Sequence, residues 1–430
     1  MSHAQRGVIA RRTNTVRRVI GGVACVLGLA VLAPTAQAQN ANTNATGPTF
    51  DLYGFVMADM IFEFGQSNPD WFDALRPSKL PAVEDEFGKD GRFYAGIRQT
   101  KFGAKSTIPT GIGQLKTTFE FDLYGVGVDA GQTTIRPRTM WGEIGHFGAG
   151  QADSPFMDGD VFPNILEYWG PAGMLYFRQP QVRWMPILPT AQNRNSKASI
   201  ALERPGASGD QGAYADRIEL DNVKARFPLP DLSADYRYGT NWGYVELGGI
   251  LRALELDDLL VDDQFDLNKS MLGWGLSLSS NYKPSQTNVV RFQVVYGEGI
   301  QNYFNDAPAD VGPKINVGDP IRPIEATPLP VFGMTLYLDH TWNKMLSTAI
   351  GYSRVDITNS SGQTAEAFRD GQYASLNLLA TPAKNIMVGG EFQWARRDNR
   401  DSFHSDDFKM QFGFKYNFGV KFENGTVAQK

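Results

Sequence analysis

The chain has 430 residues, of which 42% are hydrophobic and 20% charged, with 45 Gly, 24 Pro and a single Cys. These fractions exclude a disordered chain, a collagen and a coiled coil, and one cysteine excludes a disulfide scaffold and a cluster of zinc-binding thiolates. A net charge of −5 argues against nucleic acid as a partner, and the lack of a long apolar run past residue 40 excludes a bundle of membrane helices.

The first 38 residues predict a secretory signal peptide. Residues 1–18 hold five arginines and no acidic residue, an apolar run extends from Val19 to Leu32, and the small residues Ala36-Gln37-Ala38 follow. A signal peptidase reads this order of basic, apolar and small residues, so we expect cleavage near Ala38. An N-terminal core helix is the alternative, for which the apolar run is short.

Cleavage would leave a mature chain that begins with a short polar segment, 39–49. This chain would have 392 residues (430 minus 38), no cysteine, and 36 basic residues (41 minus the five arginines) against 46 acidic ones, a net charge of −10. An exported chain without a thiol is typical of the Gram-negative outer membrane if it also alternates with period two.

Such alternation is clearest near the C-terminus. From Phe408 to Phe418 the even positions are apolar and nearly all aromatic, and the odd positions are Lys, Gln, Gly, Lys and Asn. Successive strand residues face opposite sides of a sheet, so one face is apolar and the other polar. The apolar face would meet a core in a soluble sandwich, whereas in a transmembrane barrel it meets lipid and the polar face lines a wet lumen.

The same pattern recurs along the chain and predicts 16 strands, with 14 or 18 as alternatives because strands 135–144, 148–153 and 232–238 are weakly patterned. The predicted strands are residues 50–64, 92–107, 114–126, 135–144, 148–153, 177–187, 197–203, 232–238, 244–256, 270–283, 289–298, 330–342, 346–357, 372–381, 385–397 and 408–418.

Connections between the predicted strands alternate in length. Short turns such as 145–148 and 382–385 alternate with long polar segments such as 65–91 and 300–328. Short turns at one end and long loops at the other are typical of an outer-membrane barrel. We therefore predict an all-β fold, a transmembrane antiparallel β-barrel over residues 50–418 that is wide enough for an aqueous channel. Residues 419–430 would form a C-terminal tail.

Segment 152–176 has an unusual composition for an exterior loop. It carries several aromatic residues, including Tyr168, and the acidic residues Asp153, Asp158, Asp160 and Glu167. A loop folded into a barrel needs apolar anchors against the wall and polar groups toward the channel. We interpret the segment as an inward-folded constriction loop; packing at a trimer interface or across the mouth is the alternative.

Basic residues cluster on the polar phase of the strands near this segment. An arginine on the lipid face costs about 2–4 kcal/mol at mid-membrane, so these residues should face the lumen or lie at an interface. Rings of Arg or Lys favour anions, and a guanidinium holds a carboxylate with two hydrogen bonds. Alternatively, the arginines pair with wall carboxylates such as Asp122 and brace the barrel. The candidate ligand-path residues are Arg98, Lys116, Arg136, Arg138, Arg183, Arg237, Arg252 and Arg291.

No enzyme motif is present: the chain has no H-E-x-x-H, P-loop, Rossmann glycine pattern or G-x-S-x-G, and its four histidines are scattered. We expect a non-enzymatic protein without a cofactor or metal. An outer-membrane enzyme with a site assembled in space, and an adhesin or receptor with a closed lumen, are the alternatives.

Residues 93–187 resemble the DcaP-like outer-membrane porins. The resemblance rests on the order and spacing of E-F-D-L-Y-G from Glu120, Arg136-x-Arg138, G-Q-x-x-S-x-F-M-D from Gly150, and G-P-x-G-M with R-Q-P-Q-V-R up to Arg183. It implies a homotrimeric, 16-stranded porin in outer-membrane lipid that passes small anionic solutes such as dicarboxylates and aromatic acids. It also implies that Arg98, Arg136, Arg138 and Arg183 lie on the ligand path.

Two features depart from that family's pattern. Only about ten polar residues separate the cleavage site from Phe50, which leaves no room for the N-terminal coiled coil of some members. We therefore expect any trimer to form without that coil. The chain also continues past the aromatic Phe418, where such barrels commonly end, so either the insertion signal is internal or the tail folds back into the periplasmic mouth.

Overall fold

The computed structural model describes residues 47–430 except 218–219, 261–264, 424–425 and 428–430. The predicted signal peptide, 1–38, and most of the polar segment 39–49 lie outside the described residues.

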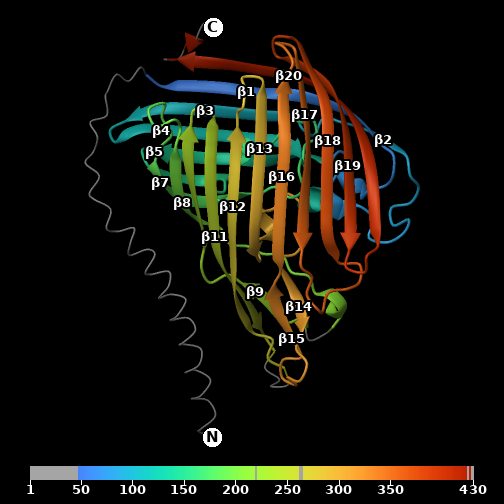
Figure 1. The fold of residues 1–430 in the computed structure, drawn as a ribbon. Coiled ribbons are helices and arrows are strands. Elements are labelled where there is room, and N and C mark those ends of the chain that lie inside the picture. The colour runs from blue at the N-terminus through green and yellow to red at the C-terminus, as the bar shows by residue number, and fades with distance from the viewer. Residues whose placement is uncertain (1–46, 218–219, 261–264, 424–425, 428–430) are drawn as a thin grey trace. The chain divides into compact units, whose positions relative to one another are not determined.

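The described chain forms a closed antiparallel β-barrel of 16 strands, as predicted (Figure 1). The last strand, β20, closes the ring by pairing with β1 along its whole length, from Thr49 opposite Glu423 to Glu63 opposite Lys409. In chain order the barrel strands are β1 (Thr49–Glu63), β3 (Lys101–Thr110), β4 (Gly113–Tyr124), β5 (Thr133–Ile144), β6 (Phe147–Asp153), β7 (Arg178–Ile187), β8 (Lys197–Glu203), β10 (Asp231–Thr240), β11 (Gly243–Asp258), β12 (Lys269–Tyr282), β13 (Asn288–Glu298), β16 (Pro330–Thr341), β17 (Leu346–Ile357), β18 (Phe368–Ala383), β19 (Ile386–Asn399) and β20 (His404–Glu423).

Five further strands extend this ring or lie beyond it. β2 (Arg92–Gly96) pairs with the end of β1, β9 (Val223–Arg226) with the end of β11, and β21 (Thr426–Val427) with the end of β20. β14 (Val311–Ile315) and β15 (Ile324–Pro328) form a separate hairpin. The short 3-10 helices are η1 (Pro69–Trp71), η2 (Pro77–Lys79), η3 (Gly127–Asp129), η4 (Gly159–Val161), η5 (Gly212–Tyr214) and η7 (Gln301–Tyr303). Within the described ranges, no helix is long and apolar enough to cross a membrane.

The apolar face of the strands is the exposed one. On β20, Met410 and Phe412 are 54% and 52% exposed, whereas Lys409 and Gln411, which alternate with them, are each 1% exposed. Exposed apolar residues on the same outward phase occur around the ring, for example Leu247, Leu276, Leu336 and Leu376. A soluble sandwich would bury this face, so the exposed belt is the lipid-facing surface of a membrane barrel.

The connections divide into two ends of the barrel, as the sequence predicted. At one end lie tight turns such as 111–112, 145–146 and 384–385, although the β7–β8 connection, 188–196, is longer. At the other end lie long connections such as 204–230 and 299–329. We call these the short-turn end and the long-loop end; in outer-membrane barrels the short turns are periplasmic.

Most strands begin or end within a few residues of their predicted bounds, and the differences are largest at β2–β3, β18 and β20. The predicted strand 92–107 is interrupted at residues 97–100, which separate β2 from β3. Within this break Arg98 is buried and pairs with Asp73. β20 continues to Glu423, five residues past Phe418, and β18 begins at Phe368, four residues earlier than predicted.

The buried apolar core lies on the inner phase of β13 to β19. Leu75 and Leu80, from the connection between β1 and β2, and Phe156 and Leu175, from the connection between β6 and β7, belong to one cluster with inner strand residues such as Tyr337. The β1–β2 and β6–β7 connections thus pack against each other and against the inner face of the barrel. This packing fixes the positions of the charged side chains on the β6–β7 connection.

Candidate pore and its charged lining

The connection between β6 and β7, residues 154–177, is hydrogen-bonded to strands from β4 to β20. At its start, the buried carboxylate of Asp158 accepts hydrogen bonds from Arg237 Nη2 at 2.7 Å, Tyr244 Oη at 2.8 Å and Ser279 Oγ at 2.6 Å. These donors come from β10, β11 and β12. Asp158 therefore anchors the segment to the inner phase of three adjacent strands.

The middle of the segment is fixed by Glu391 of β19. Its two carboxylate oxygens accept the backbone N–H groups of Leu166 at 2.7 Å and Glu167 at 3.1 Å. The Glu167 carboxylate in turn accepts the N–H groups of Leu75 and Gly170. Burial raises the pKa of Glu167 to about 8. Glu167, predicted to face the channel, instead organises the buried backbone.

Tyr168 brings the segment to the predicted arginine pair. Arg136 holds Asp122 with two hydrogen bonds, at 3.1 and 2.9 Å, and Arg138 Nη1 holds the same carboxylate at 2.7 Å. The Tyr168 hydroxyl donates to Asp122 and accepts from both guanidinium groups, and its ring stacks on Tyr124 with centroids 3.9 Å apart. Two cations share one carboxylate, so this cluster keeps an excess positive charge.

Two of the predicted arginines are closed off by carboxylates. Arg98 is 1% exposed and pairs with Asp73 at 2.5 Å. Arg252 is also 1% exposed and pairs with Asp231 at 3.0 Å and Asp310 at 2.9 Å. Because both side chains are buried, a solute in the channel does not contact either of them. Both arginines brace the wall, which is the alternative that the sequence left open.

Arg237 has the same bracing arrangement. Its guanidinium pairs with Asp158, with Asp160 at 2.6 Å and with Glu246 at 2.5 Å. Lys197 of β8 also lies 3.3 Å from Glu246. Cations on β8 and β10 are thus matched by carboxylates on the same wall or on the segment.

Three predicted cations are partly exposed. Arg183 donates to Gln181 Oε1 at 3.0 and 2.8 Å, and has no carboxylate within ion-pair distance among the described residues. Arg291 pairs with Asp339 at 2.6 Å. The Lys116 side chain is 59% exposed and lies 3.4 Å from Glu143.

Two of the predicted carboxylates of the segment are exposed. The Asp153 side chain is 51% exposed and pairs with Arg178 at 2.8 Å, and that of Asp160 is 63% exposed. Partial burial alone would raise the pKa of Asp160, but its hydrogen bond and ion pair with Arg237 hold the pKa below its ordinary value. Both carboxylates are therefore charged and accessible, unlike Asp158 and Glu167.

Sequence reasoning missed a group of lysines on the inner phase of β3 and β20. Lys101 pairs with Glu120 at 3.0 Å, whereas no ion pair of Lys105 or Lys415 is present in the described part of the chain. Lys105 Nζ lies 5.1 Å from the centre of the Tyr53 ring, and Lys415 Nζ lies 4.3 Å from that of Phe55. The signal was available, since Lys415 falls on the polar phase of the clearest strand.

A hollow of about 380 Å³ lies beside the segment near the short-turn end. Phe162 and Asn164 of the segment line it together with Arg291, Asp339 and His340 of the barrel wall. This space places the partly exposed Arg291 next to a cavity of solute size. Among the described residues, no cluster of His, Cys, Asp or Glu is arranged to hold a metal ion.

Comparison with known proteins identifies what this architecture is similar to. Residues 51–418 match the family described as DcaP outer membrane protein. No curated protein sequence matches the chain.

Solved structures share the fold. The outer membrane channel DcaP of Acinetobacter baumannii is similar with a TM-score of 0.69 and 19% identity, over 88% of this chain and 100% of that chain. The anion-selective porin from Comamonas acidovorans has a TM-score of 0.53 and 11% identity, over 86% and 100% of the two chains. A trimer form of OmpT from Vibrio cholerae has a TM-score of 0.50 and 13% identity, over 86% and 100%.

Proposed function

Because the chain belongs to the DcaP outer membrane protein family, and is an outer-membrane channel and not an enzyme, we propose that it passes small anionic organic solutes by passive diffusion. The solutes would be dicarboxylates and aromatic acids, as the resemblance to DcaP-like porins implies. No energy source is needed, because a solute moves down its own concentration gradient.

The observation that carries the proposal is which charges of the barrel interior can be reached. Lys105 is exposed, Lys415 and Arg183 are partly exposed, and none of the three has an ion pair among the described residues. The accessible carboxylates Asp153 and Asp160 are each paired with an arginine. An anion would therefore meet unpaired positive charge, which lowers its barrier relative to a cation.

Asp51 is the carboxylate placed to neutralise Lys105. It lies opposite Lys105 in the β1–β3 register, yet no ion pair joins the two residues. Lys105 instead lies against the ring of Tyr53. Its ammonium group is thus available to a passing carboxylate.

We propose that residues 154–177 fold into the barrel and narrow the channel. The hydrogen bonds of Asp158 to β10, β11 and β12, and of Leu166 and Glu167 to β19, support this path. In this arrangement Tyr168, Arg136 and Arg138 would lie at the narrow part. Arg136 and Arg138 would attract a carboxylate there, since a single carboxylate, Asp122, is shared between them.

We further propose a homotrimer in the outer membrane, exported with a signal peptide cleaved near Ala38. The trimer form of OmpT from Vibrio cholerae supports the assembly by its fold. The assembly is tested by cross-linking or by the mass of the detergent-solubilised protein, and the cleavage site by N-terminal sequencing of the mature protein.

Ion current through a planar bilayer tests the function. We expect stepwise conductance, a reversal potential in a KCl gradient that favours chloride, and concentration-dependent block by dicarboxylates. Absence of current would end the channel proposal and leave a closed-lumen receptor. A reversal potential that favours potassium would instead retain the channel and reject anion preference.

A further inference from the structure

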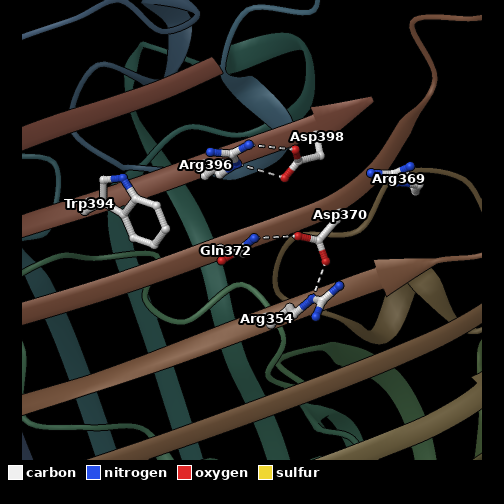
Figure 2. Close-up of a pocket in the computed structure, with 7 residues that line it drawn as sticks. All are labelled: Arg354, Arg369, Asp370, Gln372, Trp394, Arg396 and Asp398. Carbon is white, nitrogen blue, oxygen red and sulfur yellow. Dashed lines mark hydrogen bonds and ion pairs between the residues drawn. The ribbon is translucent and has the colours of Figure 1, made fainter. Parts of the chain in front are cut away.

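A second charged cluster lies on the outer face of the barrel, away from the lumen. It is formed at the long-loop ends of β17, β18 and β19 by Arg354, Arg369 and Arg396 with Asp370 and Asp398 (Figure 2). Together with Gln372 and Trp394 these residues line a hollow of about 390 Å³. The proposed passage of solutes uses none of them.

The outward direction of this cluster follows from strand periodicity. On β17, Arg354 shares its phase with Ile350, which is 49% exposed, and on β19 Arg396 shares its phase with Phe392, which is 45% exposed. Residues of the opposite phase at the same height, such as Val355 and Ala395, are fully buried. The two arginines therefore point to the same side as the apolar belt.

The height of the cluster follows from a pattern that two strands share. Toward the long-loop end, the outward-facing positions of both strands follow the same order. An apolar residue of the exposed belt comes first, then a Tyr or Trp, then an arginine and finally an aspartate. On β17 the order is Ile350, Tyr352, Arg354 and Asp356, and on β19 it is Phe392, Trp394, Arg396 and Asp398. Trp and Tyr mark the membrane–water interface, so the arginines lie one step beyond it, at the level of lipid headgroups.

The aspartates hold the arginines in place. Arg354 binds Asp370 through Nε and reaches Asp356 at 3.1 Å. Arg396 binds Asp398 with hydrogen bonds of 3.1 and 3.2 Å and lies 3.6 Å from Asp406, so it also has two carboxylate partners. Arg369 has no hydrogen bond or ion pair within the described ranges, and Figure 2 shows its guanidinium apart from the paired groups. The cluster thus presents two oriented guanidinium groups and one free one.

The rest of the outer rim differs from this patch. At the corresponding outward height, β11 carries Glu255 beyond Leu251, and β13 carries Glu298 beyond Tyr296. Arg226 of β9 lies opposite Glu255 and pairs with it and with Asp257, so Arg369, which is unpaired among the described residues, is what distinguishes the β17–β19 patch. Directly below the patch, Leu376 and Leu378 of β18 are 49% and 53% exposed, so an apolar strip continues from the charged hollow into the membrane.

We propose that this patch binds the phosphate group of a phosphorylated glycolipid in the outer leaflet, of the lipid A type. The guanidinium groups of Arg354, Arg369 and Arg396 would hold the phosphate, since a guanidinium matches phosphate oxygens with paired hydrogen bonds. The hollow would take the adjoining sugar, and the apolar strip below would contact the acyl chains. Within the described residues of the patch, Arg369 supplies the one unpaired positive charge, and the arginine-lined hollow beside an apolar strip has the general chemistry of lipid recognition.

Native mass spectrometry of the full-length protein in detergent tests this proposal. The probes are diphosphorylated lipid A, dephosphorylated lipid A and phosphatidylglycerol. The variant combines Arg354→Gln, Arg369→Gln and Arg396→Gln. The matched control combines Arg226→Gln and Arg322→Gln, whose exposed side chains also take part in ion pairs but lie outside the patch. Unchanged bilayer conductance shows that each protein is folded.

We expect diphosphorylated lipid A to bind wild type and control alike, and the patch variant at least about tenfold more weakly. Dephosphorylated lipid A and phosphatidylglycerol should bind all three proteins weakly. Equal binding of diphosphorylated lipid A to the patch variant would overturn the proposal, as would equal binding of either other lipid. A variant that loses its oligomeric state but keeps lipid binding would also overturn it, because the patch would then contact protein.

Because Arg369 has no hydrogen bond or ion pair with any described residue, its single substitution isolates binding from folding. Arg369→Gln should lower the affinity for diphosphorylated lipid A by several-fold and leave the unfolding midpoint unchanged. If the single variant binds as wild type, Arg369 is not a phosphate ligand and the three-arginine site is wrong.

Discussion

Two walls of the barrel interior differ in how their cations are neutralised. On the wall formed by β8 to β12, the braced wall, Arg237 and Arg252 are each surrounded by two or more carboxylates. On the wall formed by β1, β3 to β5 and β20, the basic wall, Lys105 and Lys415 have no ion pair among the described residues, and Arg136 and Arg138 share Asp122.

The paired cations of the braced wall therefore contribute to stability, whereas we expect the unpaired cations of the basic wall to contribute to ion selectivity. A buried arginine between two carboxylates holds the wall together but presents no charge to a solute, since its field is cancelled and its surface covered. An unpaired lysine contributes little to stability yet acts directly on an ion that passes within a few ångströms. The number of cations in the lumen is therefore a poor guide to selectivity, and their pairing is a better one.

The largest effect should follow from breaking the braced wall at Arg252. Arg252→Met leaves Asp231 and Asp310 buried without a cation, which costs on the order of 3–5 kcal/mol. We expect most of the protein to fail to fold, measured as loss of the folded band in unheated gel electrophoresis.

Arg183→Gln is the matched control for Arg252→Met, because Arg183 has no carboxylate partner within the described residues. It should fold as wild type. Equal yields of the two variants would mean that the ion pairs of Arg252 do not brace the wall.

The next effect concerns the basic wall. Lys105→Gln combined with Lys415→Gln removes two unpaired positive charges without leaving a carboxylate unpaired. We expect the chloride-to-potassium permeability ratio to fall several-fold while the unfolding midpoint stays unchanged. Reversal potentials in a KCl gradient measure the ratio. Arg226→Gln, outside the barrel interior, is the control; if it changes the ratio as much, the preference arises from overall charge.

A more specific effect, on one class of solute, is expected at the shared carboxylate. Arg136→Gln combined with Arg138→Gln removes the excess positive charge beside Tyr168 and should weaken block by a dicarboxylate about tenfold. The concentration of blocker that halves the current measures it. Block of equal strength in the variant would show that Arg136 and Arg138 only brace Asp122.

The strands and the braced wall differ in how far sequence could predict them. The period-two pattern sufficed for all 16 strands, because each strand must present an apolar face to lipid along its own length. The ion pairs were not predictable, because their partners are distant in sequence: Arg252 and Asp310 are 58 residues apart, and Arg76 and Asp306 are 230 apart.

The same limit explains the outcome for the predicted pore residues. Arg252 was assigned to the ligand path from strand phase, and Arg98 from strand phase and the family resemblance. Strand phase indicates direction but not whether a carboxylate covers the side chain. Lys415 was not predicted although it falls on the polar phase of the clearest strand. Lys105 has the opposite phase to Arg98 on the predicted strand 92–107, and only the break at 97–100 turns it inward. Strand phase alone identified most inward cations, but the carboxylates that pair with them were visible only in the structure.

The smallest effect is expected from pH, at the point where the backbone of Glu167 is bound by Glu391 of β19. Because burial raises the pKa of Glu167 to about 8, the folded protein keeps a proton at pH 7 that the unfolded chain releases near 4.5. The raised pKa means that Glu167 favours folding most below about pH 4.5, and this contribution falls as pH rises toward 8. Between pH 5 and 8 we expect the unfolding midpoint to decline by a few degrees.

Glu167→Gln separates this titration from the packing of the segment. An amide lacks the second acceptor oxygen that the N–H groups of Leu75 and Gly170 use, so the variant should be less stable at every pH. The slope with pH is therefore the informative quantity, and it should flatten in the variant. A slope equal to that of wild type would mean that Glu167 is ionised throughout, held so by its backbone donors. In that case the two backbone hydrogen bonds outweigh burial, and the segment is anchored by a charge and not by a neutral acid.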